Sequence, residues 1–159
     1  METIHHIKIK KLRPNAVVPA RATSGSAGYD LSACLDSELT LLPGQPVIIP
    51  TGIAIELTYT TPCAAFIYGR SGLGVKHGLI LSNGVGVVDS DYRGEIMVGL
   101  TNISSTPYTL QPGERIAQLV IQPVLLPLPM ETDELSETSR GAGGFGSTGR
   151  LSLHPDTNL

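Results

Sequence analysis

The stretch PVIIPTGIAIELTYTTPCAAFIY (Pro46 to Tyr68) contains three short apolar segments that are separated from one another by proline or glycine. Valine and isoleucine recur in the first two segments, and β-branched residues favour strands over helices. Proline and glycine mark turns, and segments this short are typical of strands. We therefore predict three strands, over Pro46–Ile49, Gly52–Leu57 and Cys63–Tyr68.

The same pattern continues along most of the 159-residue chain, which contains 18 glycines and 12 prolines. Strands at such regular spacing suggest a β-sandwich or jelly roll, so we predict an all-β fold. We expect one domain over residues 1–130, followed by a polar linker and a flexible glycine-rich tail over residues 131–159. The other expected strands are Ile4–Lys10, Tyr29–Cys34, Leu39–Leu42, Leu79–Ser82, Gly86–Val88, Glu95–Thr101, Tyr108–Leu110 and Ile116–Val124.

Charge and hydropathy narrow the possible partners. The net charge of −3 and the pI of about 5.7 give no overall positive field that would favour a nucleic acid. The N-terminus METIHHIKIKKL lacks the apolar segment of a signal peptide, and no run approaches the roughly 18 apolar residues that span a bilayer. We expect a soluble cytoplasmic protein that binds neither nucleic acid nor membrane. Cys34 and Cys63 lack metal-ligand spacing and are expected to be reduced core thiols.

Two loops in the first half of the chain carry polar residues that a simple turn does not require. In SAGYDLSA, Asp30 lies inside an apolar alternation, where a charge needs a partner that its neighbours do not identify. In YGRSGLGVKHG, Arg70 and Ser71 lie between glycines, a composition that lets backbone N–H groups approach an anion closely. The second loop lacks the ending of a P-loop, and a structural turn remains an alternative.

Two later segments carry further candidates. In SNGVGVVDSDYRGEI, the pair Asn83-Gly84 predicts a hairpin, and Asp89 follows a buried strand as either a functional carboxylate or a turn residue. In PGERIAQLV, Arg115 and Gln118 are three residues apart in a strand, so we expect them to point to opposite faces and only one of them to face a given site. Arg115 is equally compatible with a solvated salt bridge.

The segment RGAGGFGSTG (Arg140 to Gly149) contains five glycines in ten residues and is therefore costly to order. It matches G-x-G-x-x-G, but a dinucleotide-binding turn must follow a buried strand and open a helix. The polar residues before it and the short, proline-containing segment after it exclude that interpretation.

Together, the motifs AGYDLSA, GRSGLG, GVVDSDYRGE, GERIAQL and RGAGGFGSTG resemble in sequence order the five motifs of the trimeric dUTPases. In that family the second motif is often preceded by proline, where this chain has Gly69. The resemblance implies a jelly-roll-like distorted β-barrel and a homotrimer whose active sites are shared between subunits. It also implies hydrolysis of dUTP to dUMP and pyrophosphate with Mg²⁺, which keeps uracil out of DNA and supplies dUMP for thymidylate synthesis.

The resemblance implies a role for each candidate residue. Asp89 would activate the water that attacks the α-phosphorus, and Asp30 would hold the metal through bound water. Tyr92 would pack on the deoxyribose, Phe145 would stack on uracil as the lid of the site, and the segment from Asn83 through Gly86 to Val88 would read the base. The residues implied to bind the phosphates are Arg70, Ser71, Gly72, Gln118, Arg140, Ser147 and Thr148, with Arg115 as a less certain member.

Two alternatives belong to other functional classes. A dCTP deaminase shares this fold, but it requires a glutamate at the position that Gly99 occupies and lacks a counterpart of the tyrosine in DYRG. A noncatalytic jelly-roll module with a binding or regulatory role would not need every catalytic position filled, whereas in this chain all of them are filled. Both are therefore less favoured than a dUTPase.

Overall fold

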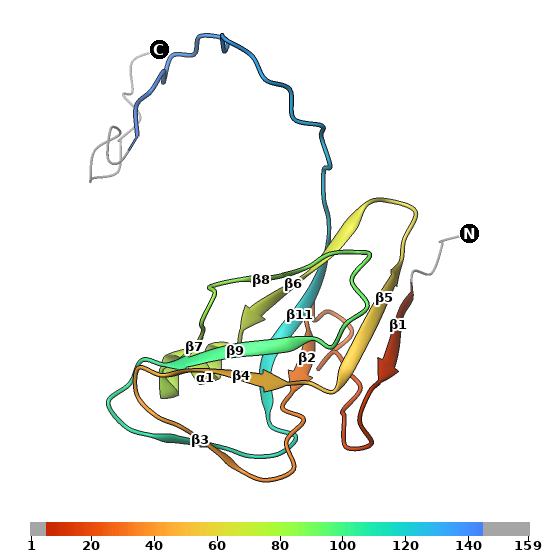
Figure 1. Cartoon of the computed structure of the whole chain (residues 1–159), viewed down its shortest axis with the longest axis vertical. Helices are drawn as coiled ribbons and strands as arrows, with labels where there is room; N and C mark the ends of the chain where they lie inside the picture. The colour runs from red at the N-terminus through yellow and green to blue at the C-terminus, as the bar shows by residue number, and fades with distance from the viewer. Residues whose placement is uncertain (1–5, 145–159) are drawn as a thin grey trace. The chain divides into compact units, whose positions relative to one another are not determined.

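The computed structural model describes residues 6–144, and the chain divides into two units, Met1–Leu126 and Pro127–Leu159. The first unit contains every strand and helix of the described residues (Figure 1). Its elements are, in chain order, β1 (His6–Lys11), β2 (Tyr29–Ser32), β3 (Leu39–Leu41), β4 (Pro46–Pro50), β5 (Ile53–Thr58), β6 (Cys63–Gly69), α1 (Ser71–His77), β7 (Leu79–Leu81), β8 (Gly86–Val88), β9 (Met97–Asn102), β10 (Tyr108–Leu110) and β11 (Arg115–Pro123).

The strands form four sheets, with orders β2-β11-β6-β8, β4-β9-β7, β1-β5 and β10-β3. In the largest sheet, β11 lies between β2 and β6, and Gln118 is opposite Asp30 on one side and Tyr68 on the other. This pairing brings three segments that are distant in sequence side by side. The prediction of an all-β fold is confirmed, although the strands within residues 6–144 do not close into one barrel.

The core is built by the alternation of side chains along the strands. In β7, Leu79 and Leu81 are buried while Ile80 is exposed, because adjacent residues of a strand point to opposite faces. Each fully buried leucine or isoleucine side chain contributes about 1.5–3 kcal/mol through the hydrophobic effect. Other large side chains that are fully buried are Leu31, Leu41, Ile49, Ile53, Ile96, Leu100, Leu110, Ile116 and Leu119.

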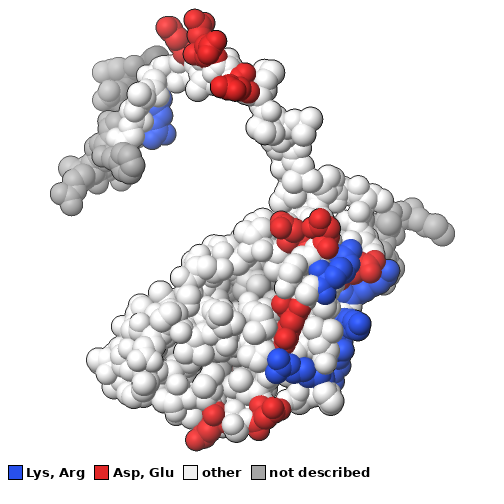
Figure 2. Space-filling view, in the orientation of Figure 1, with Lys and Arg blue, Asp and Glu red and all other residues white. Residues whose placement is uncertain are grey.

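The opposite face of the β4-β9-β7 sheet carries exposed apolar side chains. Ile48, Met97 and Ile80 are 69%, 43% and 40% exposed on the three strands. Figure 2 shows that uncharged residues cover the region over β4 and β9, whereas most charged side chains of the first unit lie towards β1 and β5 and a few acidic ones lie near β3. Exposed apolar side chains grouped on one face of a sheet are typical of an interface with another protein chain.

All eleven expected strands are present, with ends within two residues of the expected ones in the described part of the chain. The short helix α1 was not predicted, because its sequence SGLGVKH contains two glycines, which disfavour helices. It is held by tertiary packing through the buried side chain of Leu73. It is capped after His77 by Gly78, whose φ of 68° lies in the left-handed region and whose N–H group donates to the carbonyl of Gly74.

Both cysteines are free and buried, as expected for core thiols. Burial raises the pKa of the Cys34 and Cys63 thiols, which keeps them protonated. The one helix among residues 6–144 is too short to span a bilayer.

In the second unit, residues 127–144 are exposed and contain neither helix nor strand. Arg140 takes part in a local turn, where its Nε atom donates to the carbonyl of Gly143 at 3.0 Å. Phe145, Ser147 and Thr148 lie outside the described residues.

Candidate active site

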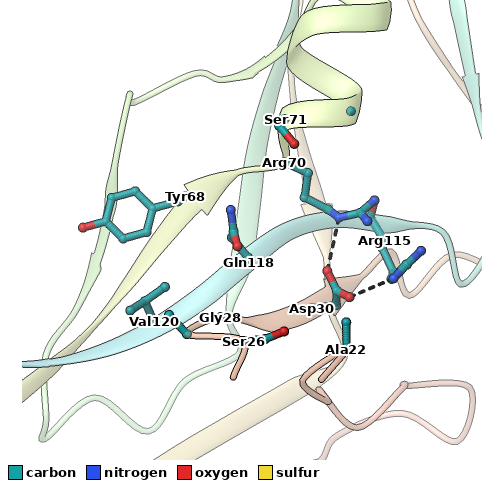
Figure 3. Close-up of a pocket in the computed structure, with 12 residues that line it drawn as sticks. Ala22, Ser26, Gly28, Asp30, Tyr68, Arg70, Ser71, Arg115, Gln118 and Val120 are labelled. Atoms are coloured by element: carbon teal, nitrogen blue, oxygen red, sulfur yellow. Dashed lines mark hydrogen bonds and ion pairs between the residues drawn. The ribbon is translucent and has the colours of Figure 1, made fainter. Parts of the chain in front are cut away.

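A cleft at the ends of β2, β6 and β11 gathers the first-unit residues that were predicted to bind phosphates. Its volume is about 420 Å³, and it is formed where the three strands meet the start of α1 (Figure 3). The candidate residues that line it are Asp30, Arg70, Ser71, Gly72, Arg115 and Gln118. We call it the phosphate cleft.

Asp30 lies between two arginines at the centre of this cleft. Its Oδ1 atom is 3.2 Å from Arg70 Nε, and its Oδ2 atom is 2.9 Å from Arg115 Nη1 (Figure 3). Arg70 Nη1 also donates to the backbone carbonyl of Arg115 at 3.0 Å. The partners of Asp30, which the sequence left open, are therefore two guanidinium groups. Two positive charges beside one negative charge leave the cleft suited to an anion.

The prediction that Arg115 and Gln118 point to opposite faces was wrong, because both line the phosphate cleft. The register of β11 on β2 shifts between Arg115 and Ala117, which is a β-bulge. A bulge inserts one extra residue into a strand and reverses the alternation beyond it. Residues three apart across the bulge can therefore face the same side.

Gly28 is a residue of this cleft that sequence reasoning missed. A β-carbon on Gly28 would lie 2.7 Å from Oε1 of Gln118, so only glycine leaves room for that side chain. The Nε2 atom of Gln118 donates to the carbonyl of Gly69 at 3.1 Å, which fixes the orientation of the amide. The glycine directly before the strand YDLS was the available signal.

Ser71 and Gly72 begin α1, directly after the extended residue Arg70 (φ −91°, ψ 129°). The first N–H groups of a helix have no carbonyl partner within the helix. They are therefore available to donate hydrogen bonds to an anion beside the arginines.

A second pocket, of about 250 Å³, contains the other predicted residues of the first unit. Asn83, Gly86, Val88, Asp89 and Tyr92 all line it. We call it the base pocket.

Two details explain how this pocket is shaped. Gly86 packs closely on β6, because a β-carbon there would lie 3.0 Å from Cβ of Ile67. Asp89 follows β8 as an exposed residue, and its carbonyl accepts the N–H of Tyr92 at 3.1 Å, which places both residues in one turn.

The hairpin predicted at Asn83-Gly84 was only partly correct. The turn itself forms, with Gly84 at φ 74° and its N–H bound to the carbonyl of Leu81. However, β7 pairs with β9 and β8 pairs with β6, so the two flanking strands belong to different sheets. The turn therefore connects a strand of one sheet to a strand of another.

The phosphate cleft and the base pocket share no lining residue in the described part of the chain. Tyr68 lines the cleft, and the adjacent Ile67 lines the pocket. Because adjacent strand residues point to opposite faces, β6 stands between these two side chains. A single chain therefore does not gather its candidate residues into one site.

Comparison with known proteins places these features in a family context. The family model described as dUTPase matches residues 14–149. A deoxyuridine 5'-triphosphate nucleotidohydrolase of Desulfitobacterium hafniense is 53% identical over 145 residues, which cover 90% of this chain and 95% of the relative. One from Paraburkholderia phymatum is 53% identical over 144 residues, covering 91% and 97%.

Solved structures show the same fold. The dUTPase of Staphylococcus bacteriophage 80alpha with dUPNHPP superposes with a TM-score of 0.80 at 27% identity, covering 91% of this chain and 99% of the other. A mutant dUTPase of phage phi11, described with a structural Mg(II) ion, superposes with a TM-score of 0.72 at 22% identity, covering 81% and 97%. These structures support a jelly-roll-like arrangement of the strands.

Proposed function

The chain belongs to the dUTPase family, and from this premise we propose that it hydrolyses dUTP to dUMP and pyrophosphate. The observation that carries the proposal is the phosphate cleft, where Arg70 and Arg115 flank Asp30 beside the start of α1. Phosphoryl transfer requires cations and N–H donors around the phosphate oxygens, and this cleft supplies both. Arg70, Ser71, Gly72, Arg115 and Gln118 would bind the triphosphate.

Asp89 would act as the general base. Its carboxylate is exposed beside the base pocket, where it can take a proton from the water that attacks the α-phosphorus. The backbone around Asn83, Gly86 and Val88 would bind uracil, and Tyr92 would pack on the deoxyribose. Specificity would then depend on shape and on polar groups that wrong nucleotides leave unpaired.

The residues of the phosphate cleft are compatible with Mg²⁺. The carboxylate of Asp30 and the amide oxygen of Gln118 are oxygen donors in one cleft, and Mg²⁺ commonly keeps several waters while binding a few carboxylates and substrate phosphates. Asp30 would hold the ion through its waters. When bound, Mg²⁺ would neutralise charge on the triphosphate.

We propose that the active enzyme is a homotrimer with shared sites. Two observations support this arrangement: the phosphate cleft and the base pocket are separate on one chain, and the apolar side chains of Ile48, Ile80 and Met97 are exposed on one face of a sheet. In such a trimer the cleft of one subunit would meet the base pocket of another. Arg140, Ser147, Thr148 and Phe145 would add contacts to phosphate and uracil.

The first test measures pyrophosphate release from the common nucleoside triphosphates. We expect rapid turnover of dUTP and far slower turnover of dTTP, dCTP and UTP, because the base pocket and Tyr92 would exclude a 5-methyl group and a 2'-hydroxyl. We expect EDTA to abolish activity and added Mg²⁺ to restore it. Ammonia release from dCTP would instead indicate a deaminase, and binding without turnover would indicate a noncatalytic module.

A second test concerns Gly28. In Gly28→Ala, the new methyl group would displace the Gln118 amide, and a lost hydrogen bond to a charged group costs about 1.5–3 kcal/mol. We expect kcat/KM for dUTP to fall roughly tenfold or more, since about 1.4 kcal/mol corresponds to a factor of ten. Gly25→Ala is the matched control, because nothing lies within 4 Å of a β-carbon at Gly25. Equal activity of the two variants would contradict a role for the Gln118 orientation.

A further inference from the structure

The turn that carries Asp89 and Tyr92 is fixed by its own hydrogen bonds. The N–H of Tyr92 donates to the carbonyl of Asp89 at 3.1 Å. The guanidinium of Arg93 donates to the carbonyls of Ser90 and Tyr92 at 2.8 and 3.0 Å. The backbone from Asp89 to Arg93 thus forms a turn that is held by local hydrogen bonds.

The Tyr92 side chain is held against Gly94 and Glu95. Its hydroxyl donates to the carbonyl of Glu95 at 3.1 Å. A β-carbon on Gly94 would lie 2.5 Å from Cζ of the ring and would also overlap the hydroxyl. The φ of Gly94 is not among the positive ones in the described chain, so its backbone does not require glycine. A side chain at this position would instead meet the phenol ring of Tyr92, which would have to move.

Glu95 connects this contact to the core of the first unit. Its Oε1 atom accepts the N–H of Gly52 at 2.8 Å, and its Oε2 atom lies 3.4 Å from Nη2 of Arg13. The side chain of Glu95 is only 21% exposed. The carbonyl that receives the Tyr92 hydroxyl is therefore anchored at the start of β5.

We propose that Gly94 is a positioning residue for sugar recognition, because it leaves the space in which the Tyr92 ring is locked. Tyr92 itself is 46% exposed, and without this contact its ring would be free to change rotamer. A fixed ring excludes a 2'-hydroxyl, whereas a ring that moves makes room for one. This inference rests on the proposed function, in which Tyr92 packs on the deoxyribose.

The experiment compares Gly94→Ala with the wild-type enzyme and with Gly25→Ala. The measured quantities are kcat/KM for dUTP and UTP and the inhibition constant of UTP against dUTP. Because an added methyl group would displace the ring, we expect the preference for dUTP over UTP to fall by about tenfold or more, within the range for a changed pocket contact. Gly25→Ala should keep the wild-type preference. A folded Gly94→Ala enzyme with unchanged preference would overturn the proposal.

Two further variants keep the result decisive. Tyr92→Phe retains the ring but loses the bond to Glu95, so we expect a smaller fall in the preference for dUTP over UTP. If Gly94→Ala does not fold, an unchanged preference in Tyr92→Phe overturns the proposal. Tyr92→Ala tests the premise, because an unchanged preference there would remove Tyr92 from sugar recognition. A wild-type protein without dUTP hydrolysis would instead contradict the proposed function itself.

Discussion

Replacing Asp89 with asparagine is expected to lower kcat for dUTP by about 10²–10⁴-fold, the usual contribution of a general base. The amide is isosteric but cannot accept the proton of the attacking water. Asp89 is exposed at the end of β8, so the melting temperature and the affinity for a non-hydrolysable dUTP analogue should change little. Single-turnover kinetics and calorimetric titration measure the two effects separately.

Asp91→Asn is the matched control for this experiment, because Asp91 is an exposed carboxylate in the same turn. This variant also removes one negative charge, two residues from Asp89, and should retain nearly wild-type turnover. If Asp89→Asn also retains most of its activity, Asp89 is a turn residue and another group activates the water.

Truncation after Glu137 is expected to reduce turnover of dUTP at least hundredfold. It removes Arg140, Ser147 and Thr148 together with Phe145, and bonds to charged groups contribute about 1.5–3 kcal/mol each. The described residues from 127 onwards are exposed, so the melting temperature and the oligomeric state should stay unchanged. Calorimetry and sedimentation velocity check this. Near full-length activity in the truncated protein would exclude the segment from catalysis.

Mixing the two inactive variants tests the shared site. After co-refolding of Asp89→Asn with the truncated chain, some sites would receive an intact Asp89 from one subunit and an intact C-terminal segment from another. We therefore expect partial recovery of activity. No recovery in verified mixed trimers would show that each site is built within one subunit, and a monomer at micromolar concentration would exclude the trimer.

The strands were predictable because their signal is local. Gly86–Val88 and Tyr108–Leu110 were located from short apolar segments between turn residues, and both match the structure. The assignment of strands to sheets was not predictable in the same way, because it depends on partners far along the chain. The turn at Asn83-Gly84 shows this, since its local conformation was expected while the separation of β7 from β8 was not.

The site was predictable in residue types rather than in geometry. The motif order located Asp30, Arg70 and Arg115, but only the pairing of β11 with β2 and β6 shows that one carboxylate lies between two arginines. The bulge in β11 could not be read from GERIAQL, because a strand and a bulged strand have the same composition. Gly28 and Gly94 were missed because their role is the absence of a side chain beside Gln118 and Tyr92.

The separation of the phosphate cleft from the base pocket also bears on when activity begins. With shared sites, a newly synthesised chain would complete its folding while still inactive, and hydrolysis would start only once three copies had met. Specific activity should then fall on dilution towards the dissociation constant of the assembly. The activity in a cell would then rise more than proportionally with the number of chains. Higher expression would increase both the number of chains and the fraction of them that is assembled.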